Sequence, residues 1–138
     1  MTFLVERLAE LQRYVEHARG IRERIAGPAA IESDLSLRND VLFSLLMIAQ
    51  LVIDIAGDLS ARRGQRFETY REAIRNLARD SHFPPELVSR LELLSGFRNI
   101  VVHEYVGIDS QRVLEALDRL DPVAEFVQIV IAIERSTT

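Results

Sequence analysis

The fold of this chain is decided by residues 41–59, which read VLFSLLMIAQLVIDIAGDL. Apolar residues recur there at helical spacing and cover more than one face, which predicts a central helix packed on two sides. Four polar side chains interrupt the segment: Ser44, Gln50, Asp54 and Asp58. Because so many polar groups are costly in lipid, we expect a buried core helix and no membrane span.

The rest of the chain follows the same helical repeat, and no segment alternates as a strand does. We expect five helices, at about residues 2–26, 34–63, 69–79, 84–105 and 109–134. Gly27-Pro28 should end the first helix, and Thr69 with Glu72 should form a capping box on the third. Pro122 should kink or split the last helix. The pattern predicts an all-α, up-and-down helical bundle that forms a single domain over residues 1–138.

The composition excludes several kinds of chemistry. The 138 residues contain no Cys and no Lys, which excludes disulfides, Cys-ligated metals, thiol nucleophiles and lysine Schiff bases. The net charge is −4, so any contact with RNA must use a local cluster of arginines. Charges at Glu6 and Arg7 come too early for a secretory signal. We expect a cytoplasmic protein without membrane association or cofactor.

The chemistry candidates lie near the end of the fourth predicted helix. Arg98 falls in the middle of an apolar stripe of that helix, where an unpartnered charge is costly. One interpretation is a structural ion pair, for example with Asp54 of the central helix. The other is a functional arginine.

His103 follows Arg98 by five residues, which corresponds to roughly 140° around a helix. One straight helix does not readily point both side chains at one atom, whereas two helices paired about a twofold axis could. The alternative for an isolated His at a helix end is a simple cap. His17 and His82 lack comparable context and are expected at the surface.

The segment R-N-I-V-V-H-E-Y, residues 98–105, resembles the signature of the HEPN superfamily, and the Tyr after the His resembles its HepT-like branch. Residues 52–56 (VIDIA), 70–73 (YREA), 96–99 (GFRN) and 106–109 (VGID) are similar to further motifs of that branch, in order along the chain. The resemblance implies a HEPN-like bundle and a dimeric, metal-independent endoribonuclease toxin. Its implied partners are an RNA substrate and a minimal nucleotidyltransferase antitoxin, with which it forms a complex.

The residue types suit RNA cleavage by the RNA's own 2′-hydroxyl. His103 is the expected proton carrier, because imidazole exchanges protons near neutral pH. Arg98 is expected to hold the phosphate oxygens, while Asn99 and Asp54 have supporting roles. No cluster of carboxylates resembles a two-metal site, so we expect no catalytic metal.

Tyr105 has two interpretations. It can be an amphipathic residue whose ring packs while its hydroxyl reaches water. The resemblance instead implies that Tyr105 accepts adenylyl groups from the antitoxin, which silences the nuclease. An alternative function is a non-catalytic adaptor that dimerises and docks a nucleotidyltransferase, a reading that the acidic net charge favours.

Overall fold

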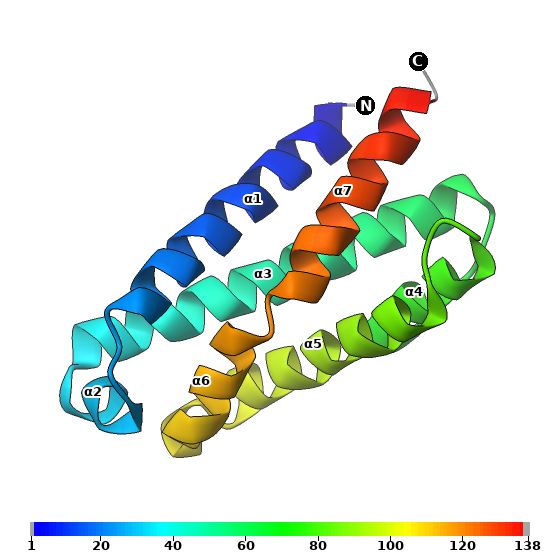
Figure 1. The fold of residues 1–138 in the computed structure, drawn as a ribbon. Helices are drawn as coiled ribbons and strands as arrows, with labels where there is room; N and C mark the ends of the chain where they lie inside the picture. The colour runs from blue at the N-terminus through cyan, green and yellow to red at the C-terminus, as the bar shows by residue number, and fades with distance from the viewer. Residues whose placement is uncertain (1, 137–138) are drawn as a thin grey trace.

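The computed structural model describes residues 2–136, which form seven α-helices and two short 3-10 turns. The helices are α1 (Thr2–Glu23), α2 (Pro28–Ser33), α3 (Leu35–Arg62), α4 (Tyr70–Arg75), α5 (Pro85–His103), α6 (Ser110–Asp118) and α7 (Asp121–Ser136). The 3-10 turns are η1 (Asn76–Arg79) and η2 (Tyr105–Gly107). The all-α prediction is confirmed, and long antiparallel helices dominate the bundle (Figure 1).

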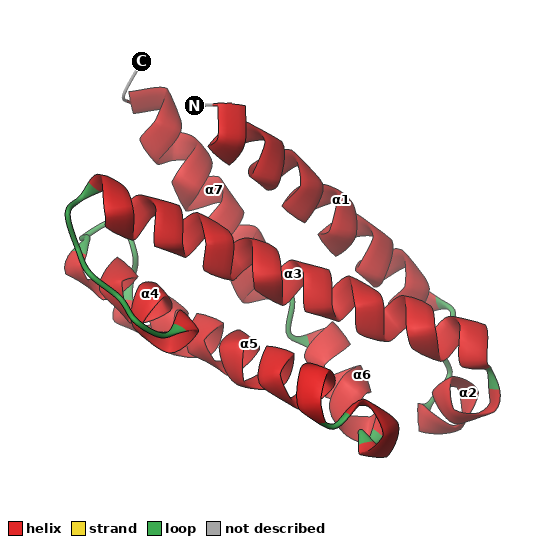
Figure 2. Cartoon of the chain, turned by 180° about the vertical axis from the view of Figure 1, so that it is seen from behind, coloured by secondary structure: helices red, strands yellow, loops and turns green. Residues whose placement is uncertain are grey.

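The long helix α3 is the centre of the bundle, as its sequence predicts. It packs against α1 and α5 on its two sides and also contacts α2, α4 and α6. Figure 2 shows α3 lying between α1 and α5, with α6 and α7 behind it. By length and composition α3 could cross a membrane, but 61% of its most apolar window is buried inside the bundle. It is therefore a core helix.

Polar caps fix the beginnings of three helices. Asp34 accepts a hydrogen bond from Leu37 N at 3.1 Å, and Asp109 accepts one from Gln111 N at 3.0 Å. Thr69 Oγ1 accepts from the backbone N of Glu72 at 3.1 Å, as the predicted capping box requires. The Glu72 carboxylate accepts from Glu68 N, one residue before the expected partner.

Two helix ends differ from the prediction, those of the first and fourth predicted helices, and prolines mark two of the boundaries. The first helix ends at Glu23, and Pro28 begins the additional helix α2, since proline suits a first helical turn. The last predicted helix splits into α6 and α7 around Leu120, as expected from Pro122, which has no N–H to continue the ladder. The fourth predicted helix ends at His103, so Tyr105 lies in the turn η2 and not on α5.

One hydrophobic cluster runs through the bundle and joins its helices. Phe83, before α5, packs on Phe126 of α7 with ring centroids 5.9 Å apart, and both rings are fully buried. At the surface, Arg22 of α1 pairs with Asp118 at 2.7 Å and holds the α6 end in place. The beginning of α1 lies beside the end of α7 (Figure 1).

Candidate active site

Three side chains from three helices hold the half-buried Arg98 of α5. Its Nε donates a hydrogen bond to Gln50 Oε1 of α3 at 3.1 Å. Its Nη1 donates to the neighbouring Asn99 Oδ1 at 3.3 Å. The Tyr70 ring, at the beginning of α4, lies 4.6 Å from the Arg98 Cζ and covers one face of the guanidinium. Arg98 is thus fixed at the junction of α3, α4 and α5.

Asp54 lies one helical turn beyond Gln50 on α3 and reaches Arg98 only through it. Gln50 Nε2 donates to Asp54 Oδ1 at 2.8 Å, and Asp54 Oδ2 lies 3.9 Å from Arg7 Nε of α1. No direct pair joins Arg98 to Asp54 among the described residues. The Arg98–Asp54 ion pair considered from the sequence is therefore wrong, because Gln50 occupies the position nearer to α5.

A hollow of about 380 Å³ opens beside Arg98. Its lining residues are Glu68, Thr69, Tyr70, Arg71, Ser95 and Asn99. Two of them, Tyr70 and Asn99, also contact the Arg98 guanidinium. Arg71 lines this hollow and is exposed, while Arg98 contacts two of the other lining residues. An exposed arginine in the lining suits an anionic ligand.

His103 is the last residue of α5, and its side chain is exposed. None of the described residues forms a hydrogen bond or an ion pair with its imidazole. Within one chain, Arg98 and His103 make no contact, since Arg98 faces α3 and α4 while His103 faces solvent. The two candidate residues therefore lie on different sides of α5, in agreement with the 140° spacing.

Tyr105 turns back from η2 onto the beginning of α3. Its hydroxyl donates to Asn39 Oδ1, and the Arg38 guanidinium donates to its backbone carbonyl. The Arg38 Cζ also lies 4.7 Å from the Tyr105 ring centroid. Tyr105 remains 39% exposed. Its ring contact with Arg38 agrees with the amphipathic interpretation of this residue.

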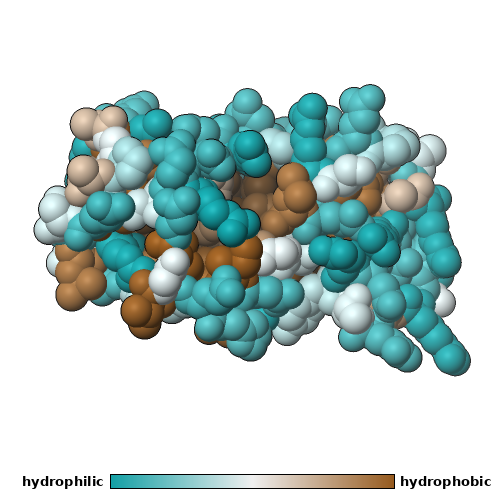
Figure 3. Space-filling view, turned by 90° about the horizontal axis from the view of Figure 1, so that it is seen from below, coloured by the Kyte–Doolittle hydropathy of each residue, from teal (hydrophilic) through white to brown (hydrophobic). Residues whose placement is uncertain are grey.

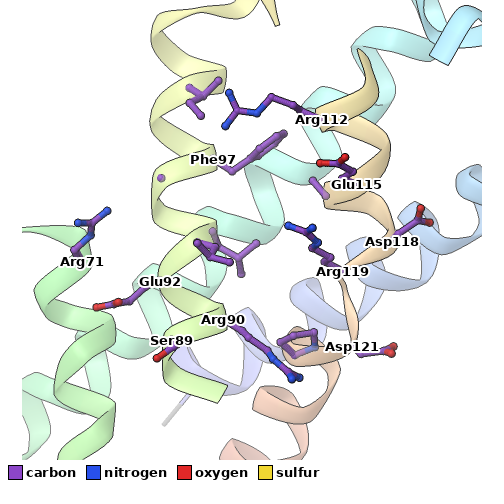
Figure 4. A pocket seen from close by; sticks show the side chains of 16 residues that line it. Arg71, Ser89, Arg90, Glu92, Phe97, Arg112, Glu115, Asp118, Arg119 and Asp121 are labelled. Atoms are coloured by element: carbon purple, nitrogen blue, oxygen red, sulfur yellow. The ribbon is translucent and has the colours of Figure 1, made fainter. Parts of the chain in front are cut away.

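A groove of about 810 Å³ lies between α5 and α6, and its lining includes neither Arg98 nor His103. Figure 4 shows Phe97 of α5 and Arg112, Glu115 and Arg119 from the α6 segment pointing into it. On the face seen in Figure 3, apolar patches alternate with hydrophilic side chains. The side chains that line the groove thus include apolar groups and groups of opposite charge.

The other two histidines are exposed and paired with carboxylates. His17 Nε2 lies 2.9 Å from Asp40, and His82 Nδ1 lies 2.6 Å from Asp80. Burial by itself raises the pKa of Asp80, but hydrogen bonds from His82 and the Arg63 charge outweigh it, so this pKa lies below its ordinary value. Among residues 2–136, no three His, Asp or Glu side chains gather as a metal site would require.

Sequence reasoning missed four residues around the candidate site: Gln50, Tyr70, Arg38 and Asn39. Gln50 was visible as a polar residue one turn before Asp54, but its partner on α5 depends on how the helices pack. The pairing of Arg38 and Asn39 with Tyr105 likewise depends on the turn after α5.

The fold is an all-α helical bundle in which Arg98 and His103 lie in the last two turns of one helix. The chain belongs to the HepT-like ribonuclease family, since the sequence profile described as "Ribonuclease HepT-like" matches residues 8–130. The mRNA nuclease HepT of Shewanella oneidensis is 21% identical over 131 residues, which cover 94% of this chain and 96% of that protein.

Solved structures share the fold at low sequence identity. One is a toxin–antitoxin crystal structure with AMP-PNP, with a TM-score of 0.84, 19% identity and coverage of 96% of this chain and 99% of that one. Another is the tri-AMPylated HEPN toxin of Shewanella oneidensis in complex with its MNT antitoxin. That chain has a TM-score of 0.82 at 20% identity, with coverage of 94% of this chain and 96% of that one.

Proposed function

We propose that this chain is an endoribonuclease toxin that cleaves RNA without a metal ion and is neutralised by a minimal nucleotidyltransferase antitoxin. Membership in the HepT-like ribonuclease family supports this proposal, as do relatives named as an mRNA nuclease and as a toxin bound to its antitoxin. The observation that carries it is Arg98, held on three sides beside an open hollow, with the unpaired His103 on the same helix.

The proposed reaction is attack of the RNA 2′-hydroxyl on the adjacent phosphate, with release of the 5′-oxygen. His103 removes the 2′-hydroxyl proton or protonates the leaving oxygen, and a second His103 supplies the other step. Arg98 binds the non-bridging phosphate oxygens and stabilises the charge that builds up on them. Asn99, exposed beside Arg98, supports the phosphate through its amide.

The active unit in this proposal is a twofold dimer formed through α5. Leu93 is 63% exposed on this helix, and Ile100 is only half-buried. A Cβ added at Gly96 would meet no atom within 4 Å, so this outward surface is open to a second helix. Two α5 helices that cross near Gly96 would bring Arg98 and His103 of both chains toward one cleft.

Regulation is proposed to act through Tyr105. The antitoxin would transfer adenylyl groups from ATP to the Tyr105 hydroxyl, two residues after His103, with release of pyrophosphate. A phosphodiester there would add bulk and negative charge next to the RNA path and compete with substrate for arginine. The exposed position of Tyr105 in η2 supports its role as an acceptor.

The test is RNA cleavage by purified protein with EDTA present. Arg98→Ala and His103→Ala should each lower the cleavage rate by roughly 10²- to 10⁴-fold without loss of helical content. His17→Ala, another exposed histidine, is the matched control and should cut at the rate of the wild type. Full cleavage by His103→Ala would refute the nuclease mechanism. A wild type that cuts no RNA yet binds a nucleotidyltransferase would indicate the adaptor instead.

A further inference from the structure

We propose that Gln50 is a positioning residue for Arg98, an inference that rests on the proposed nuclease function. Arg98 Nε donates to Gln50 Oε1 at 3.1 Å, and no other described residue accepts a hydrogen bond from this nitrogen. Asn99 and Tyr70 touch other parts of the guanidinium. Gln50 therefore sets the direction in which the plane of the guanidinium points.

The orientation of the Gln50 amide follows from the chemistry of its two neighbours. The ionised Asp54 carboxylate can only accept hydrogen bonds, so the Gln50 NH₂ group must face it, as the 2.8 Å contact requires. The amide oxygen then has to face the opposite way, toward Arg98, which can only donate. Arg7 Nε lies 3.9 Å from the other Asp54 oxygen. Only one orientation of the Gln50 amide therefore satisfies the hydrogen bonds to both Asp54 and Arg98.

A neutral amide has an advantage over a carboxylate at this position. A carboxylate in direct contact with Arg98 would cancel much of the positive charge that phosphate binding needs. Gln50 fixes the Nε side of the guanidinium without adding charge. None of the described residues accepts a hydrogen bond from the Arg98 Nη2, so this nitrogen keeps both N–H groups for a phosphate.

Two substitutions separate positioning from packing. Gln50→Met preserves the length and much of the volume of the side chain but removes both hydrogen bonds. Asp54→Asn keeps Gln50 but removes the acceptor-only neighbour, so the amide can turn over and present its NH₂ group to Arg98. Gln128→Met, on the exposed face of α7, is the matched control. Circular dichroism and thermal melting establish that each variant is folded.

The first measurement does not depend on nuclease activity. Nitrogen-15 NMR of the arginine Nε–H groups should show a signal that exchanges slowly with water in the wild type and is absent from Arg98→Ala. In Gln50→Met this signal should move and exchange faster, while in Gln128→Met it should stay unchanged. An unchanged Arg98 Nε–H signal in Gln50→Met would refute the hydrogen bond.

The second measurement is single-turnover cleavage of RNA, together with binding of a 2′-deoxy analogue that cannot be cleaved. Gln50→Met should slow cleavage by roughly 10- to 100-fold, the effect expected for a lost hydrogen bond to a charged group, while analogue binding changes less. Asp54→Asn should show a smaller loss of the same kind. In the Arg98→Ala background, Gln50→Met should cause no further loss, since Gln50 acts through Arg98.

The outcomes distinguish the inference from the function on which it rests. If the wild type cuts no RNA, the proposed function fails, and the NMR measurement still decides whether Gln50 orients Arg98. If the wild type cuts RNA and Gln50→Met slows Arg98→Ala by the same factor as the wild type, Gln50 acts independently of Arg98. That result would overturn the positioning role while leaving the nuclease intact.

Discussion

Replacement of Tyr105 by Phe should separate modification of the protein from its nuclease activity. The ring stays in place beneath Arg38, whose Cζ lies 4.7 Å from its centroid, and the contact to the Tyr105 backbone carbonyl is unaffected. Only the hydrogen bond from the hydroxyl to Asn39 is lost. Because Asn39 is exposed and can bond to water instead, the cost is about 0.5 kcal/mol, or roughly 2 °C in the melting temperature.

Tyr105→Ala should cost more, because it also removes the ring beneath Arg38. A cation–π contact at an exposed site adds about 0.5–1 kcal/mol, which doubles or triples the loss of stability. Thermal melting of the two variants therefore tests the packing of η2 on α3. Equal losses in Tyr105→Phe and Tyr105→Ala would contradict the Arg38 contact.

The assay for modification is intact-mass spectrometry after incubation with the nucleotidyltransferase antitoxin and ATP. The chain has three tyrosines, so Tyr14→Phe, whose ring packs on Phe43, provides a matched control. The wild type and Tyr14→Phe should gain mass in units of AMP and lose RNA cleavage. Tyr105→Phe should gain none and keep cutting RNA in the presence of the antitoxin. Equal modification of Tyr105→Phe would refute Tyr105 as the acceptor.

Three further predictions concern the dimer, the acid limit of stability and the core. If one Arg98 and one His103 from different chains suffice for a cleft, a mixture of Arg98→Ala and His103→Ala chains should regain part of the cleavage that each lacks alone, whereas no recovery would indicate either a site within each chain or a cleft that needs both copies of His103, as the proposed reaction does. Because the pKa of Asp80 is lowered in the folded chain, Asp80 stabilises the fold above the ordinary carboxyl pKa, and this stability is lost as the pH falls through the lowered value. Urea unfolding should therefore find Asp80→Asn less stable than the wild type at pH 6, with the difference shrinking below about pH 4. Phe126→Ala removes a fully buried ring that packs on Phe83 and should lower the free energy of unfolding by about 3–5 kcal/mol in the same assay, while a loss below about 1 kcal/mol would contradict the packing.

The sequence alone was enough to predict the long helices, though not the short α2, and to place Arg98 in an apolar stripe. Both follow from a 3.6-residue repeat, which is local information. The end of α5 was predicted two residues late, because Glu104 leaves the helix with φ −127° and ψ 29° at a position without a Pro or Gly to mark it. Tyr105, which the prediction included at the end of this helix, therefore lies in the turn η2.

The contacts of Arg98 could not be predicted, because they depend on how α3 and α5 are aligned along each other. Asp54 was the obvious acidic partner, yet the packing places Gln50 opposite the Arg98 Nε. A shift of one helical turn between the two helices would exchange these neighbours. Charge alone favoured the Asp54 carboxylate as the partner of Arg98, whereas the packing of the helices makes the Gln50 amide its partner.

The proximity of the two chain ends has a practical consequence. α1 begins beside the end of α7, whereas η2 with Tyr105 lies at the opposite end of the bundle (Figure 1). Arg98, Gln50 and Tyr70 belong to α5, α3 and α4, so no candidate residue lies on the first or the last helix. A short linker between the beginning of α1 and the end of α7, with the chain reopened at the exposed Gly64 after α3, yields a circular permutant that keeps the helices and the residues around the hollow. The order in which the chain connects the helices can thereby be changed in an experiment while the residues of the candidate site stay in place.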